Sequence, residues 1–201
     1  GAQGVTDPLD RIAAALERMA ARAEIKRLML DEVYTDASRA PRTTLRFLVP
    51  TAVVNFGGNA HGGTVMRWID EAAYACAVGW MGEAALADHA IGVYSGGIHF
   101  LAPVRIGELV EVDARIILTG PHSMHVSTRV SRADPRSPDD LVLTTQCMSV
   151  FVVPDESGVS MPVPPWHPTT GEDVRLHEHA REIIRLREST VPLAASLTLE
   201  Q

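Results

Sequence analysis

One acidic residue stands out in the apolar-rich run from Gly62 to Trp80. Asp70 has mostly alanine and large apolar side chains around it, and a carboxylate removed from water costs free energy unless it is paired or used. Arg67 and Glu71 are four positions apart, so on a helix they can pair with each other and leave Asp70 without a partner. Asp70 is therefore a candidate catalytic residue, and a structural carboxylate that is capped by backbone groups or paired with an arginine is the alternative.

The stretch Asn55–Gly63, which leads into this run, contains four glycines, namely Gly57, Gly58, Gly62 and Gly63. Glycine allows a ligand to approach the backbone closely. A helix that begins near Gly62 also presents unsatisfied N–H groups and a partial positive charge at its start. Such donors suit the oxygen of a thioester carbonyl as it gains negative charge.

The spacing of Gly63 and Asp70 sets a geometric condition. Seven residues separate them, which is roughly 10 Å along a helix, whereas reacting groups must come within about 3 to 3.5 Å. The Asp70 of one chain therefore cannot act on a carbonyl held at its own Gly63. An antiparallel helix from a two-fold partner would supply a second Asp70, so the spacing predicts a homodimer with two shared sites.

Hydrophobic periodicity indicates an α+β domain with one strand, one long helix and then four strands. The first strand is expected over residues 43–50, and the helix over 62–80 is apolar on most of its circumference, which predicts burial on all sides. The four later strands follow in a meander joined by short turns, so they should be antiparallel; they are expected over residues 90–104, 108–120, 123–133 and 141–153. Gly96 and Gly97 interrupt the first of these, which predicts a β-bulge or a close approach of a ligand.

Helical extensions flank this domain. Asp7 and Pro8 indicate the start of a helix that continues to residue 30, and the proline-rich stretch from Pro154 to Pro168 is expected to be irregular. A last helix follows Thr170, with Asp173 three residues later as a capping signal. The predicted organisation is an extension over residues 1–40, a domain over 41–154, and a linker with a helix over 155–201.

Composition narrows the class of protein. The net charge of −7 argues against a general nucleic-acid binder, whose affinity rests on neutralising phosphates. No run reaches the roughly 18 apolar residues of a membrane span, and no signal peptide is recognisable. Cys76 and Cys147 are expected to be buried free thiols, so a cytoplasmic location is predicted. No metal site is expected, since His177 and His179 face different sides of the last helix and favour a solvated surface.

Three segments together resemble one known family. "NFGGNAHGGTVMRWIDEAA", "HFLAPVRIGELVEV" and "TGPHSMHVSTRV" are similar to the hotdog-fold acyl-CoA thioesterases, in their broad-specificity acyl-CoA hydrolase branch, and the resemblance extends over about Thr43 to Val153. It implies an antiparallel sheet of about five strands wrapped around a long central helix. It also implies an acyl-CoA substrate, no cofactor apart from the coenzyme A of that substrate, and dimers that often assemble as trimers of dimers.

The resemblance assigns roles to individual residues. Asp70 matches the catalytic acid, as general base or nucleophile; Asn55 matches the asparagine that positions water or the thioester across the dimer interface; and Gly63 matches the helix-start glycine whose N–H faces the carbonyl. Arg105 is the first choice for a contact with the phosphates of coenzyme A, ahead of Arg129, Arg132 and Arg136. The expected substrate-binding residues are His61, Gly62, Gly96, Gly97, Arg105 and Ser123.

Two other functions stay open from the sequence. His61, directly before the helix-start glycines, would suit a hydratase or dehydratase that acts on enoyl or 3-hydroxyacyl thioesters, because that chemistry uses a histidine–acid pair. The helical extensions would suit a non-catalytic acyl-CoA-binding subunit. Thiol release distinguishes hydrolysis from both.

Overall fold

The computed structural model describes residues 40–53, 55–82 and 90–195, with side chains described as far as Arg187. The predicted N-terminal helix over residues 7–30 lies outside them. Along the chain the elements are β1 (Arg42–Leu48), η1 (Thr51–Val53), α2 (Gly62–Met81), β2 (Ile91–Phe100), β3 (Leu109–Thr119), β4 (Met124–Ala133), β5 (Val142–Val152) and α3 (Gly171–Ala195).

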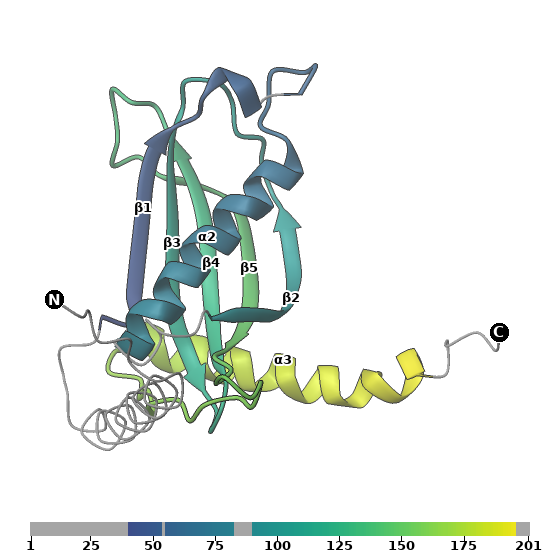
Figure 1. Ribbon diagram of the computed structural model, residues 1–201. Coiled ribbons are helices and arrows are strands. Elements are labelled where there is room, and N and C mark those ends of the chain that lie inside the picture. Colours follow the sequence, from purple (N-terminus) through teal and green to yellow (C-terminus); the bar gives the residue numbers. More distant parts are fainter. Residues whose placement is uncertain (1–39, 54, 83–89, 196–201) are drawn as a thin grey trace, which may run out of the picture. The chain divides into compact units, whose positions relative to one another are not determined.

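The five strands form one sheet in the order β1-β3-β4-β5-β2, and every neighbouring pair is antiparallel (Figure 1). The predicted meander is confirmed for β3, β4 and β5. It is wrong for β2, which pairs with β5 at the far edge of the sheet instead of with β3. The physical reason is that β1 already occupies the free edge of β3, so β2 completes the sheet on its other side.

Helix α2 lies across one face of this sheet (Figure 1). Its buried residues are Val65, Trp68, Ile69, Ala72, Ala73, Cys76, Ala77, Trp80 and Met81. The prediction that α2 is buried on all sides is wrong, because Met66 and Tyr74 are 46% and 37% exposed and Asp70 is exposed with them. A single sheet covers only one side of a helix, so the side of α2 that points away from the sheet stays exposed and is partly apolar.

The opposite face of the sheet is covered by α3, whose Ala180 packs with Ile117 and Met148. The predicted capping signal is confirmed. The N–H of Asp173 donates to Thr170 Oγ1 at 3.1 Å, and the N–H of Thr170 donates to Asp173 Oδ2 at 3.0 Å, which is the reciprocal pattern of a capping box.

His177 corrects one expectation about this helix. Its Nδ1 donates to the Ile117 carbonyl at 3.0 Å and its ring lies 6.0 Å from that of Trp166. It is therefore half-buried against the sheet and is not a solvated surface residue, whereas His179 is exposed as predicted.

The stretch between Pro154 and Pro168 is irregular, as its prolines predict. It is nevertheless fixed in place, because Pro164 accepts a hydrogen bond from Trp80 Nε1 at 3.0 Å and the Trp166 N–H donates to Thr119 Oγ1 at 2.8 Å. These bonds join the end of α2 to the end of β3.

Both cysteines are free and buried, as the sequence predicts. Burial raises the pKa of the Cys76 thiol to about 12 and raises that of Cys147 as well. Neither thiol is therefore an ionised nucleophile at neutral pH. Among the helices described, none is long and apolar enough to cross a membrane.

Candidate functional site

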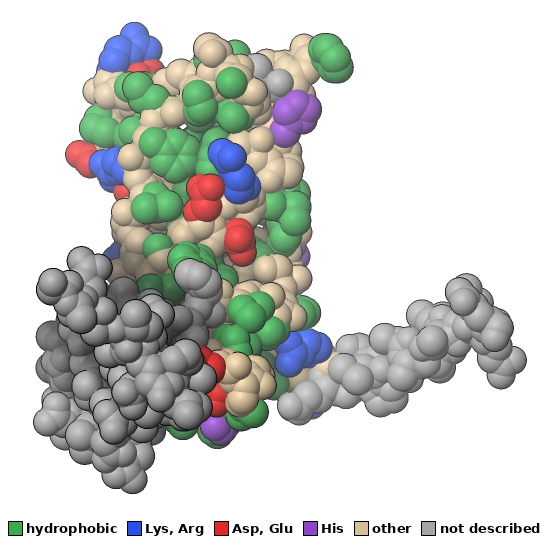
Figure 2. Space-filling view, in the orientation of Figure 1, with side chains coloured by type: hydrophobic (Ala, Val, Ile, Leu, Met, Phe, Trp, Pro, Cys, Tyr) green, Lys and Arg blue, Asp and Glu red, His purple; other side chains and the backbone are tan. Residues whose placement is uncertain are grey.

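Asp70 lies on the exposed face of α2 and has no hydrogen-bond or ion-pair partner among the described residues. The predicted Arg67–Glu71 pair forms, with 3.5 Å between Arg67 Nε and Glu71 Oε1. The Asp70 carboxylate faces β2, since a Cβ added to Gly92 would lie 3.9 Å from Asp70 Oδ1. Acidic and hydrophobic side chains share this face of the molecule (Figure 2).

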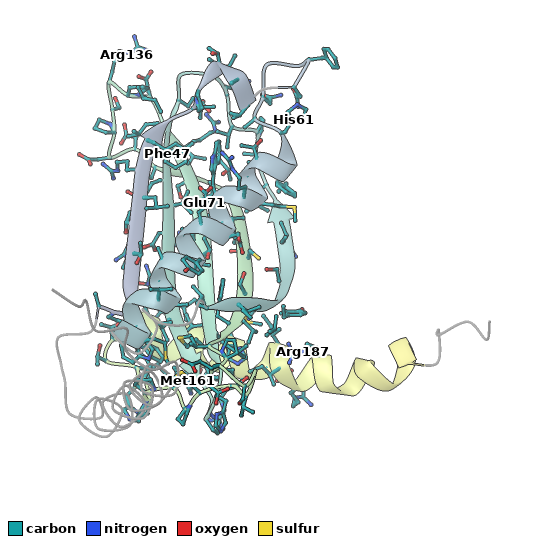
Figure 3. All side chains as sticks on the ribbon, in the orientation of Figure 1. Phe47, His61, Glu71, Arg136, Met161 and Arg187 are labelled. Carbon is teal, nitrogen blue, oxygen red and sulfur yellow. The ribbon has the colours of Figure 1, made fainter. Side chains whose placement is uncertain are left out.

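The start of α2 presents open hydrogen-bond donors. His61 is the N-cap, and its carbonyl accepts the N–H groups of Thr64 at 2.9 Å and Val65 at 3.1 Å. Within the described chain, the N–H groups of Gly62 and Gly63 have no acceptor, and both residues are exposed. The His61 side chain forms no cap hydrogen bond at this helix start, where Figure 3 labels it. These two N–H groups can therefore donate to a ligand oxygen.

A cavity of about 340 Å³ lies between α2 and β2 and has Gly63 and Asp70 in its wall. The structure thus brings together two of the three predicted catalytic residues. The remaining wall residues are Met66, Arg67, Ile69, Ser95, Ile98 and Cys147.

Asn55 closes a tight loop with its own side chain. Its Oδ1 accepts the N–H of Gly57 at 2.9 Å and that of Asn59 at 3.2 Å, while its Nδ2 has no partner among the described residues. Asn55 and Gly62 line a second cavity, of about 400 Å³, beside residues 100–104. One chain therefore does not place Asn55 and Asp70 in the same cavity. The Asn55 group without a partner is the Nδ2 amino group, which can only donate hydrogen bonds.

The two glycines of β2 produce the predicted bulge. The register of β2 against β5 shifts between Gly96 and His99, and Gly97 has a φ of 63°, which favours glycine. At Gly96 an added Cβ would clash with the Tyr94 hydroxyl. Neither glycine lines either cavity, so in one chain Gly96 makes room for Tyr94.

Arg105 lies in the turn before β3 and forms a β-bridge with Asn59 of the glycine-rich loop. Its guanidinium has no partner among the described residues. The other predicted phosphate contacts are paired instead, Arg129 with Glu172, Arg132 with Glu108 and Arg136 with Asp134. The free cation beside the loop is therefore Arg105.

Ser123 lies far from these residues within one chain. Its carbonyl accepts the Gly120 N–H at 2.9 Å in the turn between β3 and β4, at the other end of β3 from Arg105 (Figure 1). The structure of one chain therefore does not bring Ser123 to either cavity.

Six cavity residues were not among the site residues predicted from the sequence, namely Met66, Arg67 and Ile69 on α2, Ser95 and Ile98 on β2, and Cys147 on β5. Cys147 and Ser149 are two positions apart on β5, so strand periodicity could have placed their side chains on the same face of the sheet. The sequence does not show where α2 crosses β2, which is what brings Ser95 near Asp70. In the part of the chain that the structure describes, no cluster of three or more His, Cys, Asp or Glu side chains is arranged to hold a metal ion.

The chain is similar to known proteins in sequence. Residues 57–139 match the model of the Thioesterase superfamily. Protein VdlD of Helicobacter pylori is 25% identical over 145 residues, which cover 72% of this chain and 79% of VdlD.

Solved structures share the fold. The crystal structure of an apo-hexameric acyl-CoA thioesterase is 29% identical, with a TM-score of 0.66, and the match covers 75% of this chain and 94% of that one. An acyl-CoA hydrolase from Staphylococcus aureus, solved with butyryl coenzyme A and coenzyme A, is 20% identical with a TM-score of 0.69, over 78% of this chain and 92% of that one.

Proposed function

We propose that this chain is a thioesterase of the hotdog fold that hydrolyses acyl-CoA thioesters to a carboxylic acid and coenzyme A, since residues 57–139 match the Thioesterase superfamily and the fold is that of a solved acyl-CoA thioesterase. One observation carries the proposal. The unpaired carboxylate of Asp70 and the open N–H of Gly63 line a single cavity. Thioester hydrolysis requires a base and an oxyanion donor, and in a two-fold dimer each of these groups would work with its counterpart from the other chain.

In the proposed reaction the thioester carbonyl oxygen accepts hydrogen bonds from the Gly62 and Gly63 N–H groups. A water oxygen forms a bond to the carbonyl carbon while Asp70 accepts its proton, the carbon–sulfur bond breaks, and the proton passes to the coenzyme A sulfur. If an Asp70 carboxylate oxygen attacks the carbonyl carbon itself, the carbon–sulfur bond breaks and coenzyme A leaves as the thiolate; water then hydrolyses the resulting anhydride, and the proton that this step releases passes to the thiolate. Coenzyme A enters only as part of the substrate, and no other cofactor takes part.

Two chains build each site in this proposal. Gly63 and Asp70 are separated by two helical turns, roughly 10 Å, so Asp70 would act on the thioester held by a partner's α2. Support comes from the exposed apolar side chains of Met66 and Tyr74 on the same face of α2, and of Ile91 and Val93 on the edge strand β2. A homodimer would bury them, and dimers could assemble further into a trimer of dimers.

Asn55 and Arg105 complete the proposed site. The free Nδ2 of Asn55 would donate to the thioester or to the attacking water beside the start of α2. Arg105, unpaired and next to the same loop, would contact the phosphates of coenzyme A. His61 would line the entrance, and the free buried thiols of Cys76 and Cys147 support the predicted cytoplasmic location.

His61 does not favour hydration of an enoyl thioester, because it has no carboxylate partner among the described residues. The deciding experiment measures free thiol with a series of saturated acyl-CoA esters and with crotonyl-CoA. Hydrolysis releases thiol from both. Loss of the enoyl absorbance without thiol would identify a hydratase, and binding without either change would identify a non-catalytic subunit.

A further inference from the structure

A polar patch forms part of the wall of the Asp70 cavity. Ser95 of β2 and Ser149 of β5 are register partners, and their Oγ atoms are 3.0 Å apart. The Cys147 Sγ lies 3.9 Å from the Ser149 Oγ. Ser95 and Cys147 line the cavity itself, while Ser149 is only 2% exposed and lies beside Ser95 on the neighbouring strand.

This patch differs from the part of the sheet face that β3 presents to α2, although β4 and β5 also place the buried threonines Thr128 and Thr145 on that face. On β3 the residues toward α2 are Val110, Val112, Ala114 and Ile116, all apolar and buried. Burying a hydroxyl costs free energy unless it forms a hydrogen bond, and valine or alanine would fill the same position on β5 without that cost. The serine pair therefore stands where packing alone gives no reason for it.

The pair can also bind a third group. Each hydroxyl has one hydrogen and two lone pairs, so the bond between Ser95 and Ser149 uses one of their two hydrogens. The other hydrogen and the remaining lone pairs of Ser95 are available on the cavity side, where Ser95 is exposed. A ligand hydroxyl that reached this wall could both donate and accept.

The cavity is also small. Its volume of about 340 Å³ is near the lower end of the roughly 300 to 1,000 Å³ of small-molecule sites. Met66, Ile69 and Ile98 provide apolar wall, and the serine pair provides the polar part. Such a lining fits a short chain with one hydrogen-bonding group better than a long hydrocarbon tail.

Resting on the function proposed above, we propose that this cavity holds the acyl group of the substrate and that the Ser95–Ser149 pair selects short hydroxyacyl-CoA esters over unsubstituted acyl-CoA esters of equal length. The hydroxyl of the acyl chain bonds to Ser95, and Ser149 holds the Ser95 side chain in position through the hydrogen bond between their hydroxyls. Ser95 is thus the specificity residue and Ser149 a positioning residue.

The experiment compares kcat/KM for 3-hydroxybutyryl-CoA, 4-hydroxybutyryl-CoA and butyryl-CoA by thiol release. At least one hydroxylated ester should be preferred by roughly three- to tenfold, which is the range that one neutral hydrogen bond supplies. In Ser95→Ala the preference should fall to about one, and in Ser149→Ala it should fall in part. Ser127→Ala, on β4 and outside the cavity, should keep the full preference.

The outcomes separate the two proposals. Wild-type protein that releases no thiol from any ester contradicts the proposed function itself. Wild-type protein that hydrolyses all three esters equally, or a preference that survives in Ser95→Ala, overturns the assignment of the serine pair while the thioesterase function stands. Thermal melting of each variant shows whether the serine substitutions leave the fold intact.

Discussion

Gly63 and Asp70 line one cavity but stand two turns apart on the same face of α2. An oxyanion held by the Gly63 N–H is therefore too far from the Asp70 carboxylate of the same chain for direct proton transfer. A Gly63 N–H and an Asp70 carboxylate can act on the same thioester only if they come from two chains whose α2 helices lie antiparallel. The exposed apolar residues around Asp70 give such copies a surface to bury.

Replacing Asp70 with asparagine removes the base and keeps the size of the side chain. We expect kcat for acyl-CoA hydrolysis to fall by at least about a hundredfold, the usual contribution of a positioned general base, with no change in melting temperature. Glu71→Gln is the matched control, because Glu71 is the next residue on α2 and pairs with Arg67. Activity within about twofold of wild type in both variants would contradict the role of Asp70.

Mixing two inactive variants tests whether the site is shared. Asn55→Asp and Asp70→Asn chains are unfolded and refolded together, so that half of the dimers are mixed. Each mixed dimer then has one site with both changes and one with neither, and about a quarter of the wild-type rate should return. Separately refolded variants that are mixed afterwards are the control. If Asn55 and Asp70 of the same chain serve one site, no activity returns.

The local elements of this site could be predicted, but the way they meet could not. The start of α2 follows from its glycines, the bulge of β2 from Gly96 and Gly97, and the Arg67–Glu71 pair from helical spacing, since each depends only on neighbouring residues. The position of β2 beside β5 depends on β1 having taken the edge of β3, which is a contact between distant segments. For the same reason the sequence showed neither that Ser95 lies near Asp70 nor that α2 is open on one side.

The Asn55 side chain has two roles that mutation can separate: its Oδ1 fixes the loop, and its Nδ2 is the proposed donor to the substrate. In Asn55→Asp the carboxylate can still accept the N–H groups of Gly57 and Asn59, but the amide donor is lost. We expect kcat/KM to fall at least about tenfold with an unchanged melting temperature. Asn55→Ala should lower both, because it also removes the two loop hydrogen bonds. An Asn55→Asp enzyme of wild-type activity would contradict the donor role.

Asp113 ties β1 to β3 on the outer face of the sheet. It is 6% exposed, bonds to Arg42, and accepts Arg115 Nη2 at 2.9 Å. Asp113→Asn should lower the free energy of unfolding by about 1 to 3 kcal/mol, because Arg42 loses its carboxylate partner and the half-buried Arg115 keeps only Glu172. Urea denaturation at pH 7 measures this. Asp134→Asn, which breaks the exposed pair with Arg136, should leave the urea midpoint unchanged.

The same carboxylate gives stability a dependence on pH. Burial alone would raise the pKa of Asp113, but its bonds to Arg42 and Arg115 outweigh that effect and hold the pKa below its ordinary value. The ionised form is thus favoured in the folded state, and its contribution is complete above the unfolded pKa of about 3.9. The contribution should be lost as pH falls through the lowered folded value. The stabilities of wild-type and Asp113→Asn protein in urea should therefore converge as the pH falls below the ordinary carboxyl pKa of about 3.9.

Protonation of His125 should destabilise the protein at a higher pH than protonation of Asp113 does. It is 6% exposed, its Nδ1 has no partner among the described residues, and burial, followed by the charge of Arg187, lowers its pKa from 6.5 to about 4. Between these values the unfolded chain binds a proton that the folded chain does not, so stability falls as pH drops from about 6.5 to about 4. The full effect is on the order of 3 kcal/mol.

In His125→Gln this part of the pH dependence should disappear from urea denaturation curves, whereas His179→Gln, on the exposed side of α3, should retain it. An unchanged pH dependence in His125→Gln would show that protonation of His125 is not the cause of this loss of stability.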